Sequence, residues 1–173
     1  MVKSLYNRRN KKYVMFGDLK ISYVVISDNK NFLKKNFKRR IWHHHKFVTE
    51  LLSKETCLIG RKTFDLTNWK GKKSWIITRN KKFKVDGIGV IHNLEDIRLF
   101  AEDDTIYILG GRSLYIQLQE YVDELHFYVF NNKEGDEDWI DINIKDWIPV
   151  DYLSNDIWSY AKLSRQSTKQ KRL

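Results

Sequence analysis

Short apolar runs separated by polar segments recur along the chain, a pattern that predicts buried strands. Residues 21–27 (ISYVVIS) are β-branched and apolar without interruption, which is typical of a strand covered on both faces. Six further runs predict strands: TCLIG at 56–60, SWIIT at 74–78, GIGVIH at 87–92, TIYILGG at 105–111, DELHFYVF at 123–130 and WSYAKLSR at 158–165. The segments between several of these runs are long enough to hold helices.

Apolar residues at helical spacing occupy some of those segments. From Trp42 to Ser53 they fall at 42, 47, 48, 51 and 52, which predicts one amphipathic helix. Residues 93–101 combine a candidate Asn cap with helix-spaced apolar residues, and residues 112–121 repeat that period. Residues 28–41 are mostly polar and basic and predict a loop. Alternating strands and helices predict parallel βαβ units, with ligands at the carboxyl ends of the strands.

The composition is that of one folded domain. A chain of 173 residues can bury one hydrophobic core but is short for two, and an apolar content of 42% argues against disorder. We therefore expect a single domain over residues 21–165, preceded by a basic extension at 1–20 and followed by a basic tail at 166–173. The only proline, Pro149, lies in a late acidic, tryptophan-rich segment that we interpret as a connection.

The sequence also bears on location. No apolar run approaches the roughly 18 residues of a membrane span, and the N-terminal residues lack the apolar core of a signal peptide. Cys57, the only cysteine, lies in an apolar run and is predicted to be a small core residue in a reducing compartment. We expect a soluble cytoplasmic protein without a membrane partner.

The positive charge is concentrated at the two ends of the chain. Of the net charge of +10, residues 1–50 hold 13 Lys/Arg against 3 Asp/Glu, whereas residues 51–164 hold 15 against 19. Residues 165–173 (RQSTKQKRL) add four basic residues and no acid. These ends are either solvated tails that serve solubility or a surface for an anionic partner, such as nucleic acid or an acidic protein.

Two strand-to-helix junctions carry glycine. Gly110 and Gly111 separate an apolar strand from a helix, and Gly60 does the same earlier in the chain. Donor side chains follow each junction: Arg112 and Ser113 after the glycine pair, and Arg61, Lys62 and Thr63 after Gly60. Bare backbone at a helix start can contact a phosphate, although a double glycine is as often a structural turn. Two such junctions predict one long, multiply charged ligand such as a dinucleotide.

Taken in order, GRKTF, SWIITRN, YILGGRSLY and DELHFYVF closely resemble the dihydrofolate reductase family. The resemblance covers about residues 21–165 and is strongest over 56–130. It implies a single-domain α/β fold with a central, mainly parallel twisted sheet and helices on both faces. It also implies NADPH as cofactor and reduction of 7,8-dihydrofolate, or a related pterin, to the tetrahydro form used in one-carbon metabolism.

The same resemblance implies roles for single residues around the cofactor. Gly60, Arg61, Lys62 and Thr63 match the segment that binds the NADPH phosphates, and Thr78 and Arg79 match the strand end beside the adenosine 2'-phosphate. Gly110 and Gly111 match a cis-linked glycine pair under the nicotinamide, and Arg112, Ser113 and Leu114 match positions next to the pyrophosphate. Tyr115 matches a tyrosine near the nicotinamide and is expected, with His44, to be catalytic.

On the substrate side the resemblance is weaker. Lys72 falls where the family has an arginine for the folate carboxylate, and lysine lacks the bidentate fork. Trp42, Val48 and Tyr128 are further expected substrate contacts. Val25 is also expected to contact the substrate. Val24, Val25 and Ile26 stand where the family usually has alanines packed against the pterin, so their larger side chains would narrow the substrate pocket.

The family's acidic residue, which helps to protonate the pterin, is replaced by His44. A histidine can donate a proton near neutral pH but cannot accept two hydrogen bonds as a carboxylate does. No metal is expected at residues 43–45 (HHH), because consecutive residues on a helix point in different directions.

Two functions therefore stay open. The first is an NADPH-dependent reductase in which His44 or a nearby water supplies the proton. The second is the same fold reused as a non-catalytic binding or structural component, in a viral particle or a nucleoprotein assembly, through its basic ends. The Lys/Asn-rich, proline-poor composition is that of an AT-rich genome, including those of many phages, and fits either function.

Overall fold

The computed structural model describes residues 10–13, 15–28, 50, 52–67, 69, 71, 73–130, 146–156 and 158–166. Nearly all of the loop predicted at 28–41, and most of the helix predicted from Trp42 to Ser53, lie outside the described residues.

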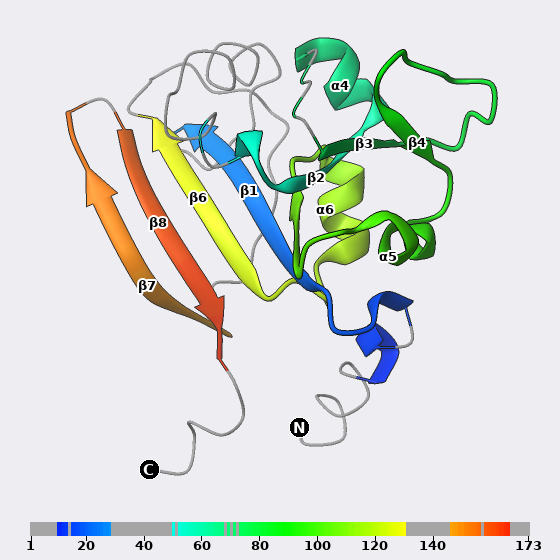
Figure 1. The fold of residues 1–173 in the computed structure, drawn as a ribbon. Coiled ribbons are helices and arrows are strands. Elements are labelled where there is room, and N and C mark those ends of the chain that lie inside the picture. The colour runs from blue at the N-terminus through cyan, green and yellow to red at the C-terminus, as the bar shows by residue number, and fades with distance from the viewer. Residues whose placement is uncertain are drawn as a thin grey trace.

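The described strands form one eight-stranded sheet in the order β4-β3-β2-β5-β1-β6-β8-β7 (Figure 1). Their bounds are β1 (Lys20–Asp28), β2 (Thr56–Gly60), β3 (Lys73–Ile77), β4 (Gly89–Ile91), β5 (Thr105–Ile108), β6 (Glu124–Phe130), β7 (Trp147–Ser154) and β8 (Trp158–Arg165). Neighbouring strands from β4 to β6 are parallel, and β8 is antiparallel to both β6 and β7. The predicted α/β class with a mainly parallel, twisted sheet is confirmed.

The helical elements whose bounds the structure describes are short. They are α4 (Arg61–Thr67), η1 (Leu94–Asp96), α5 (Ile97–Phe100) and α6 (Arg112–Leu118), and residues 10–13 and 15–16 are also helical. The helix predicted at 93–101 is thus divided into a 3-10 turn and an α-helical turn. Asn93 stands at the predicted cap position, but its side chain donates to the Asp96 carboxylate at 3.3 Å and caps no backbone N–H.

Alternate residues of β1 face opposite sides of the sheet, and each side has its own hydrophobic core. One core contains Ile21, Tyr23 and Val25 together with Leu114 and Leu118 of α6. The other contains Val24, Cys57, Ile59, Tyr128, Tyr160 and the helical residue Leu52. Helical residues therefore cover both faces, as predicted, and Cys57 is a fully buried core residue whose pKa is raised by that burial.

The segment predicted as a connection around Pro149 is a strand, so that prediction is wrong. Among the described strands β7 pairs with β8 alone and forms the sheet edge, where a proline removes no inner hydrogen bond. The register shifts between Pro149 and Asp151, and Tyr152 is 63% exposed. An edge strand that buries little has no apolar alternation, which is why the pattern did not reveal it.

Part of the predicted N-terminal extension packs against the sheet. Phe16 is buried, and its ring lies edge-on to Tyr121 with centroids 5.5 Å apart. The folded unit therefore includes residues before the predicted boundary at residue 21. Within the part of the chain that the structure describes, no helix is long and apolar enough to cross a membrane.

Candidate functional site

The two glycine junctions lie side by side because β2 and β5 are neighbours in the sheet. Their parallel ladder pairs Leu58 with Ile108, so both strands end at the same edge. Beyond the ladder, the Leu109 N–H donates to the Leu58 carbonyl at 2.9 Å, and the Gly60 N–H donates to the Gly110 carbonyl at 2.7 Å. Strand pairing therefore brings two segments, fifty residues apart in sequence, into direct backbone contact.

Close approach at this edge requires residues without side chains. The Gly110–Gly111 peptide is cis, as the resemblance implied, and Gly110 has φ of +101°. A Cβ on Gly60 would lie 3.3 Å from the Gly111 nitrogen, and one on Gly111 would lie 2.7 Å from Oγ1 of Thr63. Gly60, Gly110 and Gly111 therefore form one small surface of uncovered backbone beside Thr63, which we call the cradle.

Helix α6 starts directly from this cradle. Gly111 is its N-cap residue, and its carbonyl accepts hydrogen bonds from the N–H groups of Leu114 and Tyr115 at 3.0 and 3.1 Å. Arg112 and Ser113 are exposed, whereas the side chain of Leu114 is buried in the core. Leu114 can thus offer a cofactor only its backbone.

Tyr115 links α6 to β1. Its buried hydroxyl donates to the Val24 carbonyl at 2.5 Å, and the Tyr23 hydroxyl donates to the Tyr115 carbonyl at 2.6 Å. Burial raises the pKa of both tyrosines far above the ordinary value, so both hydroxyls stay protonated. These two hydrogen bonds join the first turn of α6, which starts at the glycine pair, to β1.

The end of β3 lies next to this cradle, since Gly60 pairs with Ile77 in the sheet. Thr78 is buried, and its Oγ1 accepts the Asn80 N–H at 3.2 Å. Its carbonyl contacts Nδ1 of His92 at 2.7 Å, whereas Arg79 is exposed. The predicted adenosine-side residues are therefore at the same sheet edge as the glycines.

Arg61 and Lys62 open α4 at this edge. Lys62 is exposed, and the Arg61 guanidinium lies 3.4 Å from the Asp65 carboxylate and 5.9 Å from the centre of the Phe83 ring. Phe83 and Asp65 were not among the predicted site residues. The helical i, i+4 spacing of Arg61 and Asp65 could have indicated the ion pair, but no local signal places Phe83 against α4.

The substrate side is described only in part. His44, Trp42, Val48 and Lys72 lie outside the described residues. Val25 and Tyr128 belong to the cores on opposite faces of the sheet, so their side chains cannot line one pocket. The expectation that both contact the substrate is therefore wrong for one of them. Because side chains alternate along a strand, Val24 rather than Val25 shares a face with Tyr128.

That face is filled by aromatic rings around Tyr128. The rings of Tyr128 and Tyr160 are 4.8 Å apart, and Trp158 lies 6.2 Å from Tyr128. Nδ1 of His126 is 2.8 Å from the Tyr160 hydroxyl, and burial lowers the pKa of His126 to about 4. His126 is thus neutral at pH 7, and sequence reasoning had assigned it no role.

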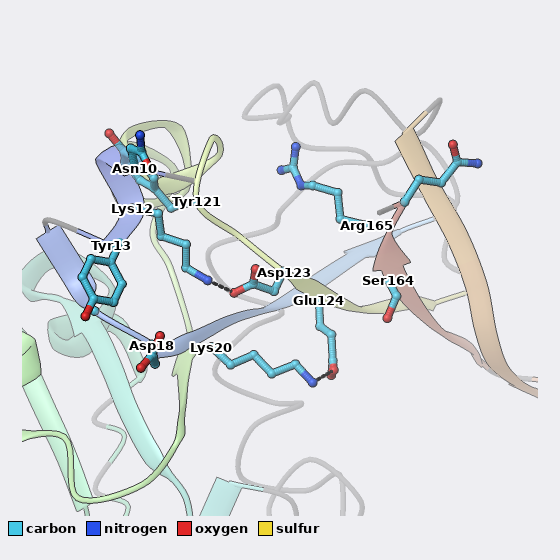
Figure 2. Close-up of a pocket in the computed structure, with 12 residues that line it drawn as sticks. Asn10, Lys12, Tyr13, Asp18, Lys20, Tyr121, Asp123, Glu124, Ser164 and Arg165 are labelled. Carbon is cyan, nitrogen blue, oxygen red and sulfur yellow. Dashed lines mark hydrogen bonds and ion pairs between the residues drawn. The ribbon is translucent and has the colours of Figure 1, made fainter. Parts of the chain in front are cut away.

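A separate pocket of about 560 Å³ lies at the opposite end of the strands (Figure 2). It is lined by Asn10, Lys12, Tyr13, Gly17, Asp18, Lys20, Tyr121, Asp123, Glu124, Ser164, Arg165 and Gln166. Lys12 pairs with Asp123, and Lys20 pairs with Glu124 at 2.5 Å. The first ion pair ties the N-terminal helical residues to Asp123, directly before β6, and the second ties β1 to β6.

Comparison with known proteins gives a consistent result. A sequence profile described as dihydrofolate reductase matches residues 20–159. The dihydrofolate reductase of Staphylococcus aureus strain Mu50 is 30% identical over 112 residues, which cover 61% of this chain and 69% of that protein. The dihydrofolate reductase of Bacillus subtilis strain 168 is 22% identical over 134 residues, covering 73% and 79%.

A solved structure extends the match in three dimensions. The dihydrofolate reductase from Enterococcus faecalis, complexed with NADP(H) and RAB-propyl, superposes with a TM-score of 0.72 at 20% sequence identity. The superposition covers 86% of this chain and 97% of that one. The two proteins therefore share a fold over nearly the whole of the solved chain.

Proposed function

The chain belongs to the dihydrofolate reductase family, and from this premise we propose that it reduces 7,8-dihydrofolate, or a related pterin, to the tetrahydro form with NADPH. The observation that carries the proposal is the cradle formed by Gly60, Gly110 and Gly111 at adjacent strand ends. One elongated ligand can reach both junctions there, because their backbones touch.

The residues around the cradle fit NADPH. A Cβ on Gly111 would meet Thr63, so this edge excludes side chains where a cofactor needs to approach the backbone. Arg61, Lys62 and Arg79 are cationic residues at this edge and are the proposed phosphate contacts, with Thr78, Arg112 and Ser113 as further donors. When bound, NADPH would supply the hydride.

The reaction also needs a residue or a water that donates a proton to the pterin. Tyr115 is not a donor, because its pKa is raised and its hydroxyl proton is directed at the Val24 carbonyl. His126 is not one either, since it is buried and neutral above a pH of about 4. His44, or a water beside it, is therefore the proposed source, with Trp42, Val48, Lys72 and Tyr128 as proposed substrate contacts.

The described residues give no support to the alternative function, a non-catalytic binding or structural component. Lys12 and Lys20 pair with carboxylates of the same chain, and Arg165 donates to the Val122 carbonyl at 2.9 Å. These cations stabilise the fold. An anionic partner for residues 1–50 and 165–173, a phage origin and an association with virions stay predictions from the sequence, as does a cytoplasmic location.

A spectrophotometric assay at 340 nm with dihydrofolate and NADPH tests the proposal. We expect turnover by the wild-type chain. His44→Asp restores the family's carboxylate, and His45→Asp is the matched control, because it adds the same charge one position away. Background activity in the wild type together with a gain in His44→Asp alone would identify a retired active site and overturn the proposal.

A further inference from the structure

The aromatic side chains of Tyr128, Tyr160 and His126 form a contact chain that joins β6 to β8. Tyr128 and Tyr160 are paired across the two antiparallel strands and belong to the same core, so they share one face of the sheet. The ring centres of Tyr128 and Tyr160 are 4.8 Å apart. The Tyr160 ring also stacks on that of His126, at 6.0 Å with 25° between the ring planes. Tyr160 is therefore the ring that links His126 to Tyr128.

A hydrogen bond fixes Tyr160 within this chain of contacts. Nδ1 of His126 is 2.8 Å from the Tyr160 hydroxyl, and both residues are only 4% exposed. Nε2 of His126 is also buried and has no hydrogen-bond partner among the described residues. Because a buried N–H is left unpaired more rarely than a buried lone pair, the proton lies on Nδ1, which donates to the Tyr160 oxygen. At a buried site water cannot replace this bond, so its loss is costly.

The position of Tyr128 depends on these neighbours. Tyr128 is fully buried, and a second ring, that of Trp158, lies 6.2 Å away. In a close-packed interior a ring cannot turn unless the rings that touch it also move. Of the proposed substrate contacts, Tyr128 is the one that lies within the described part of the chain. Whatever fixes Tyr160 therefore also fixes a proposed substrate contact.

We propose that His126 and Tyr160 are positioning residues that hold Tyr128 for the pterin half of the substrate, so that the hydrogen bond between them controls the affinity for dihydrofolate and not that for NADPH. The inference rests on the proposed function, since it deepens the assignment of the substrate side. Helix α6, which starts at the cradle, packs through Leu114 and Tyr115 into the core on the opposite face of the sheet. The proposed cofactor contacts are thus separated from this hydrogen bond by the sheet itself.

Binding measurements test this role without any need for catalysis. Calorimetry with the full chain gives the affinities for dihydrofolate and for NADPH, each measured alone, of the wild type, Tyr160→Phe and His126→Leu. The first substitution keeps the ring and removes only the hydroxyl, and the second removes both ring nitrogens. Tyr107→Phe is the matched control, because the Tyr107 ring also lies 5.7 Å from that of His126, whereas the His126 hydrogen bond goes to Tyr160. Thermal unfolding of each variant checks that it folds.

We expect Tyr160→Phe and His126→Leu to weaken dihydrofolate binding about three- to fivefold and to leave NADPH binding within about twofold of the wild type. The control should alter neither affinity. His126→Asn should restore the affinity for dihydrofolate, because an asparagine amide can reach the place of Nδ1 and donate to Tyr160. A role in packing alone would not distinguish asparagine from leucine in this way.

A double-mutant cycle tests whether the effect passes through Tyr128. Tyr128→Leu removes the ring that Tyr160 is proposed to hold, and it should itself weaken dihydrofolate binding. Adding Tyr160→Phe to that variant should then cause no further loss.

Unchanged affinity for dihydrofolate in both Tyr160→Phe and His126→Leu would overturn the inference. So would equal weakening of both ligands, which would indicate a general loosening of the fold, or a full further loss when Tyr160→Phe is added to Tyr128→Leu. If the wild type binds dihydrofolate with the expected pattern but does not turn it over, the proposed reaction fails while the positioning inference stands. If it does not bind dihydrofolate at all, both fail.

Discussion

The carboxyl ends of β2 and β5 and the amino ends of β1 and β6 are built from opposite kinds of residue. At the first, glycines and a threonine leave backbone uncovered. At the second, Lys12 and Lys20 are paired with the carboxylates of Asp123 and Glu124 (Figure 2). Arg165 donates to the Val122 carbonyl at the same end. One end therefore has uncovered backbone, and the other has side-chain contacts that join neighbouring parts of the sheet.

Buried charge at the amino end is well compensated. Glu124 is 5% exposed, and it accepts contacts from Lys20 at 2.5 Å and Lys162 at 3.2 Å. Burial alone would raise the pKa of Glu124, but the two lysines outweigh it and hold that pKa below its ordinary value. This end thus contributes to stability through charge pairs between side chains, whereas the glycine cradle is joined by backbone hydrogen bonds.

The largest effect is expected from closing the cradle with Gly111→Ala. The new Cβ would lie 2.7 Å from Oγ1 of buried Thr63, so the free energy of unfolding should fall by about 1–3 kcal/mol and the affinity for NADPH by about tenfold or more. Chemical denaturation and calorimetry measure the two effects. Adding Thr63→Ala should restore much of the stability, and a double variant as unstable as Gly111→Ala alone would show that the clash lies elsewhere.

Asp123→Ala tests the opposite end. Its carboxylate accepts from Lys12 and from the Ile21 N–H at 2.9 Å, so its loss should lower the free energy of unfolding by about 1–2 kcal/mol and leave NADPH affinity unchanged. Urea denaturation gives the first value. Asp18→Ala, at an exposed carboxylate of the same pocket, should cost less than about 0.5 kcal/mol. A change in NADPH affinity in the Asp123 variant would mean that the two ends are coupled.

Glu124→Gln tests whether the charge pairs at the amino end make the stability of the protein depend on pH. Since the pKa of folded Glu124 is lowered, its ion pairs stabilise the protein above the pKa of about 4.3 of an unfolded glutamate, and that contribution is lost as the pH falls through the folded pKa. We expect the variant to be about 1 kcal/mol less stable at neutral pH. Denaturation curves from neutral to acidic pH should converge below the folded pKa, and a constant difference would rule out this linkage.

The smallest effect is expected from Arg165→Lys. Arginine donates to the carbonyls of Val122 and Gln119 at 2.9 and 2.6 Å and lies 4.8 Å from the Trp147 ring centre. Lysine keeps the charge but not the planar fork, so the free energy of unfolding should fall by about 0.5–1 kcal/mol. Thermal unfolding measures it. A stability equal to that of the wild type would show that charge alone matters at this position.

Much of the cofactor side could be predicted because its signals are local. Strand composition, the glycines at strand ends and the donors after them all lie within a few residues of one another, and the structure places Gly60, Gly110 and Gly111 together as expected. The joint assignment of Val25 and Tyr128 to one substrate pocket failed because a shift of one residue moves a side chain to the other face of a sheet. β7 was missed because an exposed edge strand has no apolar pattern.

The sequence by itself determined where the inner strands lie and where the chain leaves its backbone bare, because both depend on the side chains of neighbouring residues. Only the tertiary structure decided that the two glycine junctions touch, that Phe83 lies against Arg61, and that Lys12 meets Asp123, which is 111 residues away. These contacts depend on the order of strands in the sheet. That order is selected by the burial of the whole domain, and no short segment of the chain encodes it.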